Sequence, residues 1–191
     1  MKYFNRLHLS FIPLFFLTTC HSWNFYADPD DKGLSRFTSR GYNIATSYIN
    51  GSPFRNIGLY YPLLQKDSTG NSIDTLKFTW PLYPNDLPNR SAAYDNISFL
   101  LPVPATFTKN DFLTFNGHRF ANSIPVILRE SSSKSISGIA SLYFVSISEN
   151  LASPDYRYLK LSGLFDGKIG DSVLITKGRF DFEVGENGLN F

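Results

Sequence analysis

The sequence predicts an all-β protein, a single domain built as an antiparallel β-sandwich or β-barrel. Aromatic residues make up 16% of the 191 residues and charged residues only 18%, a balance that favours pleated, half-buried surfaces. Eleven prolines and 13 glycines are spread along the chain, which indicates many turns. Strand-like segments do not alternate with long helical patterns, so a parallel sheet is not expected.

The domain begins with a predicted hairpin. Residues 41–49 alternate mostly between apolar and polar side chains, which is typical of a strand. Asn50 and Gly51 follow, and both tolerate the positive φ angles of a two-residue hairpin turn. Residues 53–61 are the predicted return strand.

Residues 73–80 (IDTLKFTW) show the clearest alternation in the chain. The face that holds Phe78 and Trp80 is predicted to be buried, except for Asp74 at the start of the strand. The next segment, 81–90, contains three prolines and is predicted to be a loop.

Residues 94–101 form another predicted strand, which Pro102 and Pro104 should end. Residues 107–115 fit either a single helical turn capped by its Thr-Lys-Asn-Asp start or the end of a strand. Asn-Gly at 116–117 predicts a second hairpin turn.

The C-terminal third contains the strongest strands. We expect strands at 124–128, 136–148, 156–165 and 172–184. The segment 136–148 is apolar on both faces and should be central, whereas 131–135 (SSSKS) is a predicted link. Asp166-Gly167 predicts a third hairpin turn. On the last strand Phe180, Phe182 and Val184 should face one way, and Arg179, Asp181 and Glu183 the other.

The charge balance argues against nucleic-acid binding. The chain has 18 basic and 16 acidic residues, and without Lys2 and Arg6 the two totals are equal. A nucleic-acid partner requires a basic footprint, which a neutral domain lacks.

The sequence offers no catalytic, metal or cofactor motif. Of three histidines only His118 lies in the predicted domain, where it follows a turn and is expected to be exposed, and no Gly-x-Ser-x-Gly elbow occurs. One such histidine and no cysteine after Cys20 argue against a zinc site. No glycine-rich phosphate loop is present, so no cofactor is expected.

The acidic residues leave glycoside hydrolysis open as a possible chemistry. Asp28, Asp30 and Asp31 form a cluster without the glycine-spaced pattern of a calcium loop, and we interpret it as a solvated acidic loop. A glycosidase needs a pair of catalytic carboxylates, and the sequence does not show which of the four glutamates could belong to one. Glu183 is expected at the surface. The glutamates are Glu130, Glu149, Glu183 and Glu186.

Aromatic residues provide the candidate ligand site. Trp80, Tyr83 and Tyr94 flank the proline-rich segment 81–90, where they could form a platform for a glycan or a small apolar ligand. In the alternative interpretation, Trp80 fills the core and the two tyrosines cover its edge.

The first twenty residues have the layout of an export signal. Lys2 and Arg6 form a basic start, and the apolar run 7–17 is too short to span a bilayer, which needs about 20 residues. The run ends in Leu17-Thr18-Thr19-Cys20, which resembles the lipobox of bacterial lipoproteins. An ordinary cleaved signal with a cysteine near its end by chance is the alternative.

On these residues and on its strand pattern, the chain resembles the small cell-envelope lipoproteins of Gram-negative bacteria. Many of these are a single β-sandwich or lipocalin-like β-barrel. The resemblance implies a signal peptide over 1–19, a lipidated Cys20, a polar tether over 20–40 and a β-rich domain over 41–191. It also implies anchoring to the outer membrane, facing the periplasm or the cell surface.

Three functions remain open at this point. The first is a non-catalytic, membrane-anchored binding or structural module of the cell envelope. The second is a barrel that carries a small apolar ligand in its interior. The third is a glycan or ester hydrolase whose site the sequence does not reveal.

Overall fold

The structure of the protein is a computed structural model. It confirms the prediction of a single all-β domain. The described residues are 27–57, 63–67, 73–84, 94–130, 134–153, 156–185 and 189–190. Among them no helix is long and apolar enough to cross a membrane.

Eleven strands and one short helix make up the described part of the chain. They are β1 (Ile44–Ile49), β2 (Ser52–Ile57), β3 (Leu63–Asp67), β4 (Ile73–Pro81), β5 (Tyr83–Pro84), β6 (Tyr94–Pro104), α1 (Lys109–Leu113), β7 (Arg119–Glu130), β8 (Ser135–Ser153), β9 (Tyr156–Ile169), β10 (Val173–Gly185) and β11 (Leu189–Asn190). All strands join one sheet in the order β11-β3-β4-β6-β7-β8-β9-β10-β1-β2-β5. Every pairing is antiparallel except that of β11 with β3.

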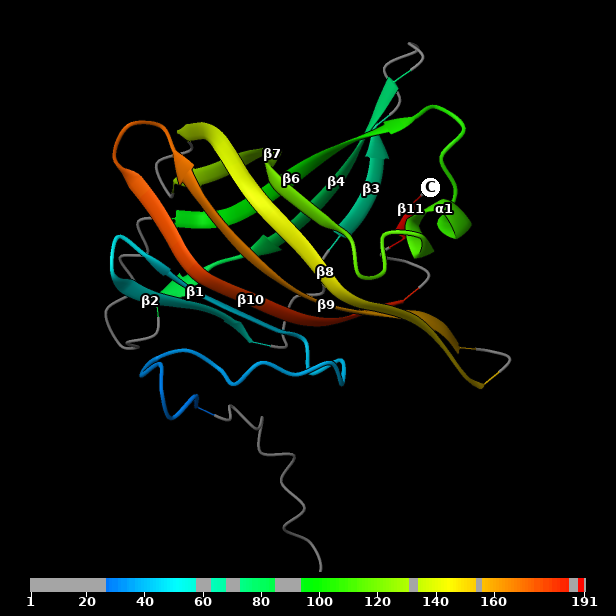
Figure 1. Cartoon of the computed structure of the whole chain (residues 1–191), viewed down its shortest axis with the longest axis horizontal. Coiled ribbons are helices and arrows are strands. Elements are labelled where there is room, and N and C mark those ends of the chain that lie inside the picture. Colours follow the sequence, from blue (N-terminus) through cyan, green and yellow to red (C-terminus); the bar gives the residue numbers. More distant parts are fainter. Residues whose placement is uncertain are drawn as a thin grey trace, which may run out of the picture.

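The sheet is strongly curled (Figure 1). β5 follows β4 after a single residue, Leu82, whose N–H still donates to the carbonyl of Asp95 on β6. β5 then pairs with β2, which lies seven places away from β4 in the strand order. Because β4 and β5 form one continuous path, the sheet closes on itself as a barrel instead of stacking two sheets.

Aromatic side chains fill the inside of this barrel. β4 buries every second side chain, as predicted for the face with Phe78 and Trp80, and both rings are 0% exposed. Their ring centroids lie 4.8 Å apart, and Trp80 stacks on Phe99 at 5.2 Å. Rings from β9 and β10 complete the cluster: Phe165, Phe180 and Phe182. Such edge and offset contacts stabilise a core beyond the area that they bury.

Asp74 is buried, contrary to the expectation of an exposed strand start. It is 2% exposed and lies 3.7 Å from the ammonium group of Lys66. β3 pairs alongside β4 and brings Lys66 to this end of the strand. The neighbouring cation makes burial of the carboxylate tolerable.

The prediction that Pro102 and Pro104 end a strand is wrong. β6 continues through both residues to Pro104. Beyond Phe99, β6 pairs with β4 alone, because its pairing with β7 stops there. A proline lacks an N–H to donate, and this open edge does not require one.

The turn predictions had mixed outcomes. Asn50 and Gly51 have φ angles of 50° and 79° and join β1 to β2, as predicted. The helical turn proposed within 107–115 is also present as α1, capped by Thr108. The Asn-Gly pair at 116–117 makes no hairpin, because it joins α1 to β7 instead of joining two strands.

The hairpin predicted at Asp166-Gly167 is also wrong, since β9 runs on to Ile169 and the turn lies at 170–172. Gly167 is needed for close packing instead. A Cβ on this residue would lie 2.8 Å from the Cβ of Ala140 on the neighbouring strand.

Two further predictions are only partly covered by the structure. Residues 83 and 84 of the predicted loop 81–90 form β5, and 85–90 lie outside the described residues. The return strand predicted for 53–61 is present as β2, while 58–61 also lie outside the described residues.

Candidate functional site

The most distinctive site is a charged clamp that holds residues 27–43 on the outside of the barrel. We call these residues the strap; it runs below β1, β2 and β10 in Figure 1. Leu34, at the middle of the strap, is 0% exposed, and Ala27 bridges to Ser35. The strap therefore packs as part of the globular unit.

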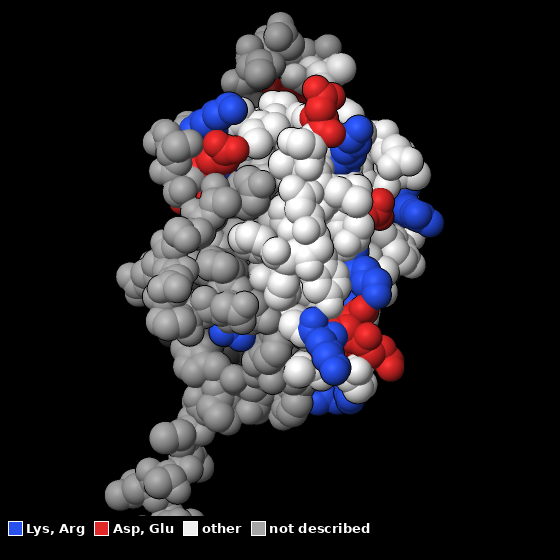
Figure 2. Space-filling model, turned by 90° about the vertical axis from the view of Figure 1, so that its left-hand side faces the viewer, with Lys and Arg blue, Asp and Glu red and all other residues white. Residues whose placement is uncertain are grey.

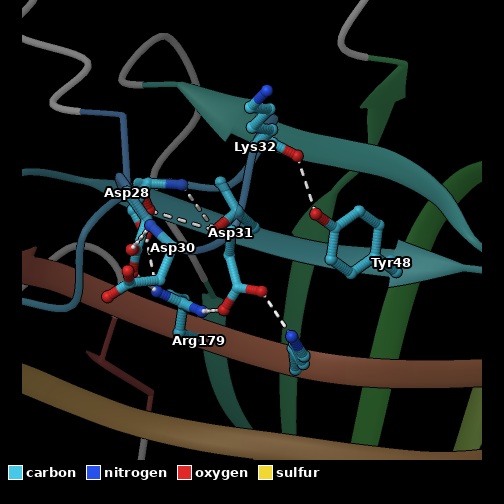
Figure 3. Close-up of polar contacts among 9 residues, drawn as sticks. Asp28, Asp30, Asp31, Lys32, Tyr48 and Arg179 are labelled. Carbon is cyan, nitrogen blue, oxygen red and sulfur yellow. Dashed lines mark hydrogen bonds and ion pairs between the residues drawn. The ribbon is translucent and has the colours of Figure 1, made fainter.

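Arg179 on β10 is the centre of the clamp (Figure 3). Its two terminal nitrogens donate separately, one to Asp28 and one to Asp31, the latter at 2.8 Å. The nitrogen that meets Asp28 also donates to the carbonyl of Ser35 at 3.0 Å. One guanidinium group thus fixes three points of the strap, a geometry suited to its rigid fork of donors.

The interpretation of the acidic cluster as a solvated loop is wrong for two of its residues. The side chains of Asp28 and Asp31 are only 16% and 15% exposed, because they face Arg179. Asp30 is exposed, and its backbone N–H donates to the Asp28 carboxylate at 2.9 Å.

A β-bulge adds a second cation to the clamp. Lys177 has a φ of 52°, and the pairing register of β9 and β10 shifts between Ile175 and Gly178. Bulges re-aim side chains, and here Lys177 forms an ion pair with Asp31.

Asp181 holds the second half of the strap. Its carboxylate accepts a hydrogen bond from the hydroxyl of Thr38, and from the backbone N–H groups of Arg40 at 3.0 Å and Gly41 at 2.7 Å. Arg179 and Asp181 face outward from β10 as predicted, but the strap covers them and both are buried. Arg179 and Asp181, two outward-facing residues of opposite charge on β10, therefore hold the first and the second half of the strap.

β1 supplies uncharged contacts to the same segment. The hydroxyl of Thr46 accepts from the backbone N–H of Ser35 at 3.2 Å and lies 3.0 Å from its hydroxyl. Tyr48 donates to the carbonyl of Lys32 at 2.7 Å, a contact visible in Figure 3. These bonds satisfy strap polar groups that docking removes from water.

The clamp holds its charged groups ionised. The pKa of Asp28 is lowered by the hydrogen bond from the backbone of Asp30 and then by Arg179. The pKa of Asp31 is lowered by Lys177 first and by Arg179 second, and Asp31 in turn raises the pKa of Lys177. Carboxylates held ionised in this way are unsuited to donate protons as general acids. The arrangement is that of a docking contact.

Burial raises the pKa of Glu183, and the positive charge of Lys160 opposes this shift. Glu183 is half-buried, not fully at the surface as expected. Its neighbour on the same face, Asp181, already accepts three hydrogen bonds. The two therefore do not form an available acid–base pair.

The structure describes only one of the three side chains predicted to bind a ligand. Trp80 lies wholly inside the core, so it offers no exposed stacking surface. The backbones of Tyr83 and Tyr94 lie in β5 and at the start of β6, but their side chains are outside the described set, as is Cys20.

Other candidate chemistry is sparse among the described residues. His118 is exposed, as expected, and its ring packs 4.4 Å from that of Phe120. No group of three or more potential metal ligands occurs in this part of the chain. The end of the barrel turned to the viewer in Figure 2 shows a broad uncharged centre with basic and acidic side chains interspersed at its rim.

Comparison with known proteins places the chain in no group: no protein family, curated protein or solved structure matches it. The site residues that the sequence did not predict are Arg179 and Asp181. Their outward position was evident from the alternation of β10. The one available signal of their role was the acidic cluster far upstream, whose charge complements that of Arg179.

Proposed function

We propose that the protein is a lipid-anchored component of the bacterial cell envelope, attached through Cys20 to the outer membrane and facing the periplasm or the cell surface. Its barrel is a binding or structural module without a catalytic role. The observation that carries this proposal is the position of the only cysteine of the chain, directly after a short apolar segment with a basic start. Attached acyl chains would hold the protein on a bilayer.

The strap is consistent with this role. Six residues separate Cys20 from Ala27, where the described contacts to the barrel begin. The proposed tether is therefore shorter than the 20–40 segment expected from sequence. The clamp at Asp28 and Asp31 would pass any pull on the anchor directly to β10.

The experiment is mass spectrometry of the N-terminal peptide, combined with membrane fractionation. We expect an N-terminus at Cys20 that carries acyl chains, and a Cys20→Ser variant that is not acylated and moves to the soluble fraction. Thr19→Ser is the matched control and should remain acylated and membrane-bound. An unmodified N-terminus in the wild-type protein would refute the anchor.

A carrier of a small apolar ligand is less well supported. The described aromatic side chains of the interior pack directly against each other; for instance, the ring centroids of Phe78 and Phe180 are 5.4 Å apart. One observation favours a polar guest instead. The side-chain amide of Asn56 and the Trp80 indole N–H are buried inside the barrel, and neither has a hydrogen-bond partner in the part of the chain that the structure describes. Such groups normally meet a protein group or an ordered water.

We propose no hydrolase function. The carboxylates that converge on the clamp, Asp28 and Asp31, share Arg179 and have lowered pKa values. A glycosidase instead needs one carboxyl group that remains protonated at its working pH.

A further inference from the structure

We propose that the outer side of the strap is a membrane-contact surface, at which Lys32, Arg36 and Arg40 meet the phosphates of lipid headgroups. The inference rests on the proposed lipid anchor. It adds an orientation: the barrel lies with β10 and β1 toward the bilayer and with β6 and β7 away from it.

The first argument is the reach of the chain. Seven residue steps lead from Cys20 to Ala27, and even fully extended they span at most about 25 Å. A domain of this size is about 40 Å across, so half of its circumference is about 60 Å. A chain that short cannot pass around the barrel to place β7 on the membrane while the strap remains clamped.

The second argument is how the strap sorts its charges. Asp28 and Asp31 point inward to Arg179 and Lys177, where each is already paired. The basic side chains of the strap lie outside instead, at every fourth residue: Lys32, Arg36 and Arg40 are all exposed. Docking therefore hides two of the acidic groups of the strap and leaves a surface of net positive charge, since Asp30 is its one exposed acid. Positive side chains within reach of anionic headgroups are attracted to them.

The third argument is the exposed aromatic ring of Tyr42, which lies next to Arg40. Tyr42 is 41% exposed, and its hydroxyl accepts a hydrogen bond from Arg40. A tyrosine with an exposed ring and a polar end suits the boundary between headgroups and acyl chains. The hydrogen bond places the ring beside Arg40, so this part of the strap presents a cation and an exposed tyrosine together.

The test uses the full-length, lipid-modified protein in vesicles. Acylation uses the Cys20 thiol, so a cysteine introduced by Ser39→Cys or Ser123→Cys is the only free thiol for a fluorescent label. Both positions are exposed, Ser39 on the strap and Ser123 on β7 across the barrel. The vesicles contain phosphatidylethanolamine and phosphatidylglycerol with a nitroxide on a fraction of the headgroups, and matched vesicles are made of phosphatidylcholine.

We expect the label at position 39 to be quenched at least about fivefold more strongly than the label at 123, since even one of the three cations near an anionic surface raises contact by about that factor. The difference should shrink in phosphatidylcholine vesicles. It should also shrink in the triple variant Lys32→Gln, Arg36→Gln, Arg40→Gln, provided that its urea unfolding midpoint is unchanged.

The alternative outcomes separate the two proposals. If the protein floats with the vesicles but both labels are quenched equally, or position 123 more, the membrane-contact surface is refuted and the anchor stands. Undiminished quenching in the triple variant refutes the role of the three basic side chains. A protein that does not float with the vesicles refutes the anchor, and the orientation with it.

Discussion

Replacing Asn56 by valine should stabilise the protein. Asn56 points from β2 into the barrel beside Ala45 and is 0% exposed. Neither its amide nitrogen nor its amide oxygen has a hydrogen-bond partner among the described residues. Valine suits a strand and places no polar atom in the interior, although its two methyl groups occupy somewhat more volume than the planar amide. The substitution therefore removes a cost of folding and adds a smaller cost of repacking.

The size of the effect follows from the burial. A buried polar group without a partner costs about 1–3 kcal/mol. Valine has one heavy side-chain atom fewer than asparagine but a larger volume, and repacking around its two methyl groups costs about 1 kcal/mol. The free energy of unfolding should therefore rise by up to about 2 kcal/mol. In a domain of this length each kcal/mol corresponds to a shift of about 2–4 °C in the melting temperature.

The assay is equilibrium urea unfolding followed by tryptophan fluorescence. Ser141→Ala is the control, because the Ser141 hydroxyl is also buried but donates to the side chain of Asn122 at 3.0 Å. That control should lose about 1 kcal/mol, since a satisfied hydrogen bond is removed. A loss of stability in Asn56→Val as well would contradict the premise of an unpartnered amide. It would favour the alternative in which Asn56 and Trp80 hold a polar guest.

The remaining predictions concern the clamp. Arg179→Met should speed trypsin cleavage within the strap, because Asp28 and Asp31 lose their shared cation. The control Arg129→Met, on the exposed side of β7, should leave the cleavage rate unchanged. Equal cleavage rates in the two variants would show that the clamp does not hold the strap. Acid should also release the strap. Both aspartates have pKa values below their ordinary 3.8, so their stabilisation is complete above that pH and is lost as the pH falls through the lower folded values. Hydrogen exchange of residues 27–43, corrected for the intrinsic rate, should show protection at pH 5 that falls by pH 3, and constant protection would contradict the ionic account.

Local patterns in the sequence were sufficient for the longer strands and one hairpin, but not for the short strands β3, β5 and β11. The alternation in 73–80 predicts which face of β4 is buried, because successive side chains of a strand point to opposite sides. Asn50-Gly51 predicts its turn, because few other pairs adopt positive φ at two successive positions. The same rule failed at 166–167, where the requirement for glycine comes from Ala140 on another strand.

The sequence by itself determined the all-β class, the outward direction of Arg179 and Asp181 and the candidate anchor at Cys20, since each depends on composition or on neighbours along the chain. Only the tertiary structure decided that the sheet closes through β5 and that the strap covers β10. These features depend on pairs such as Asp28 and Arg179, which lie 151 residues apart. Local propensity carries no information on such pairs, because the contact exists only once the barrel has formed.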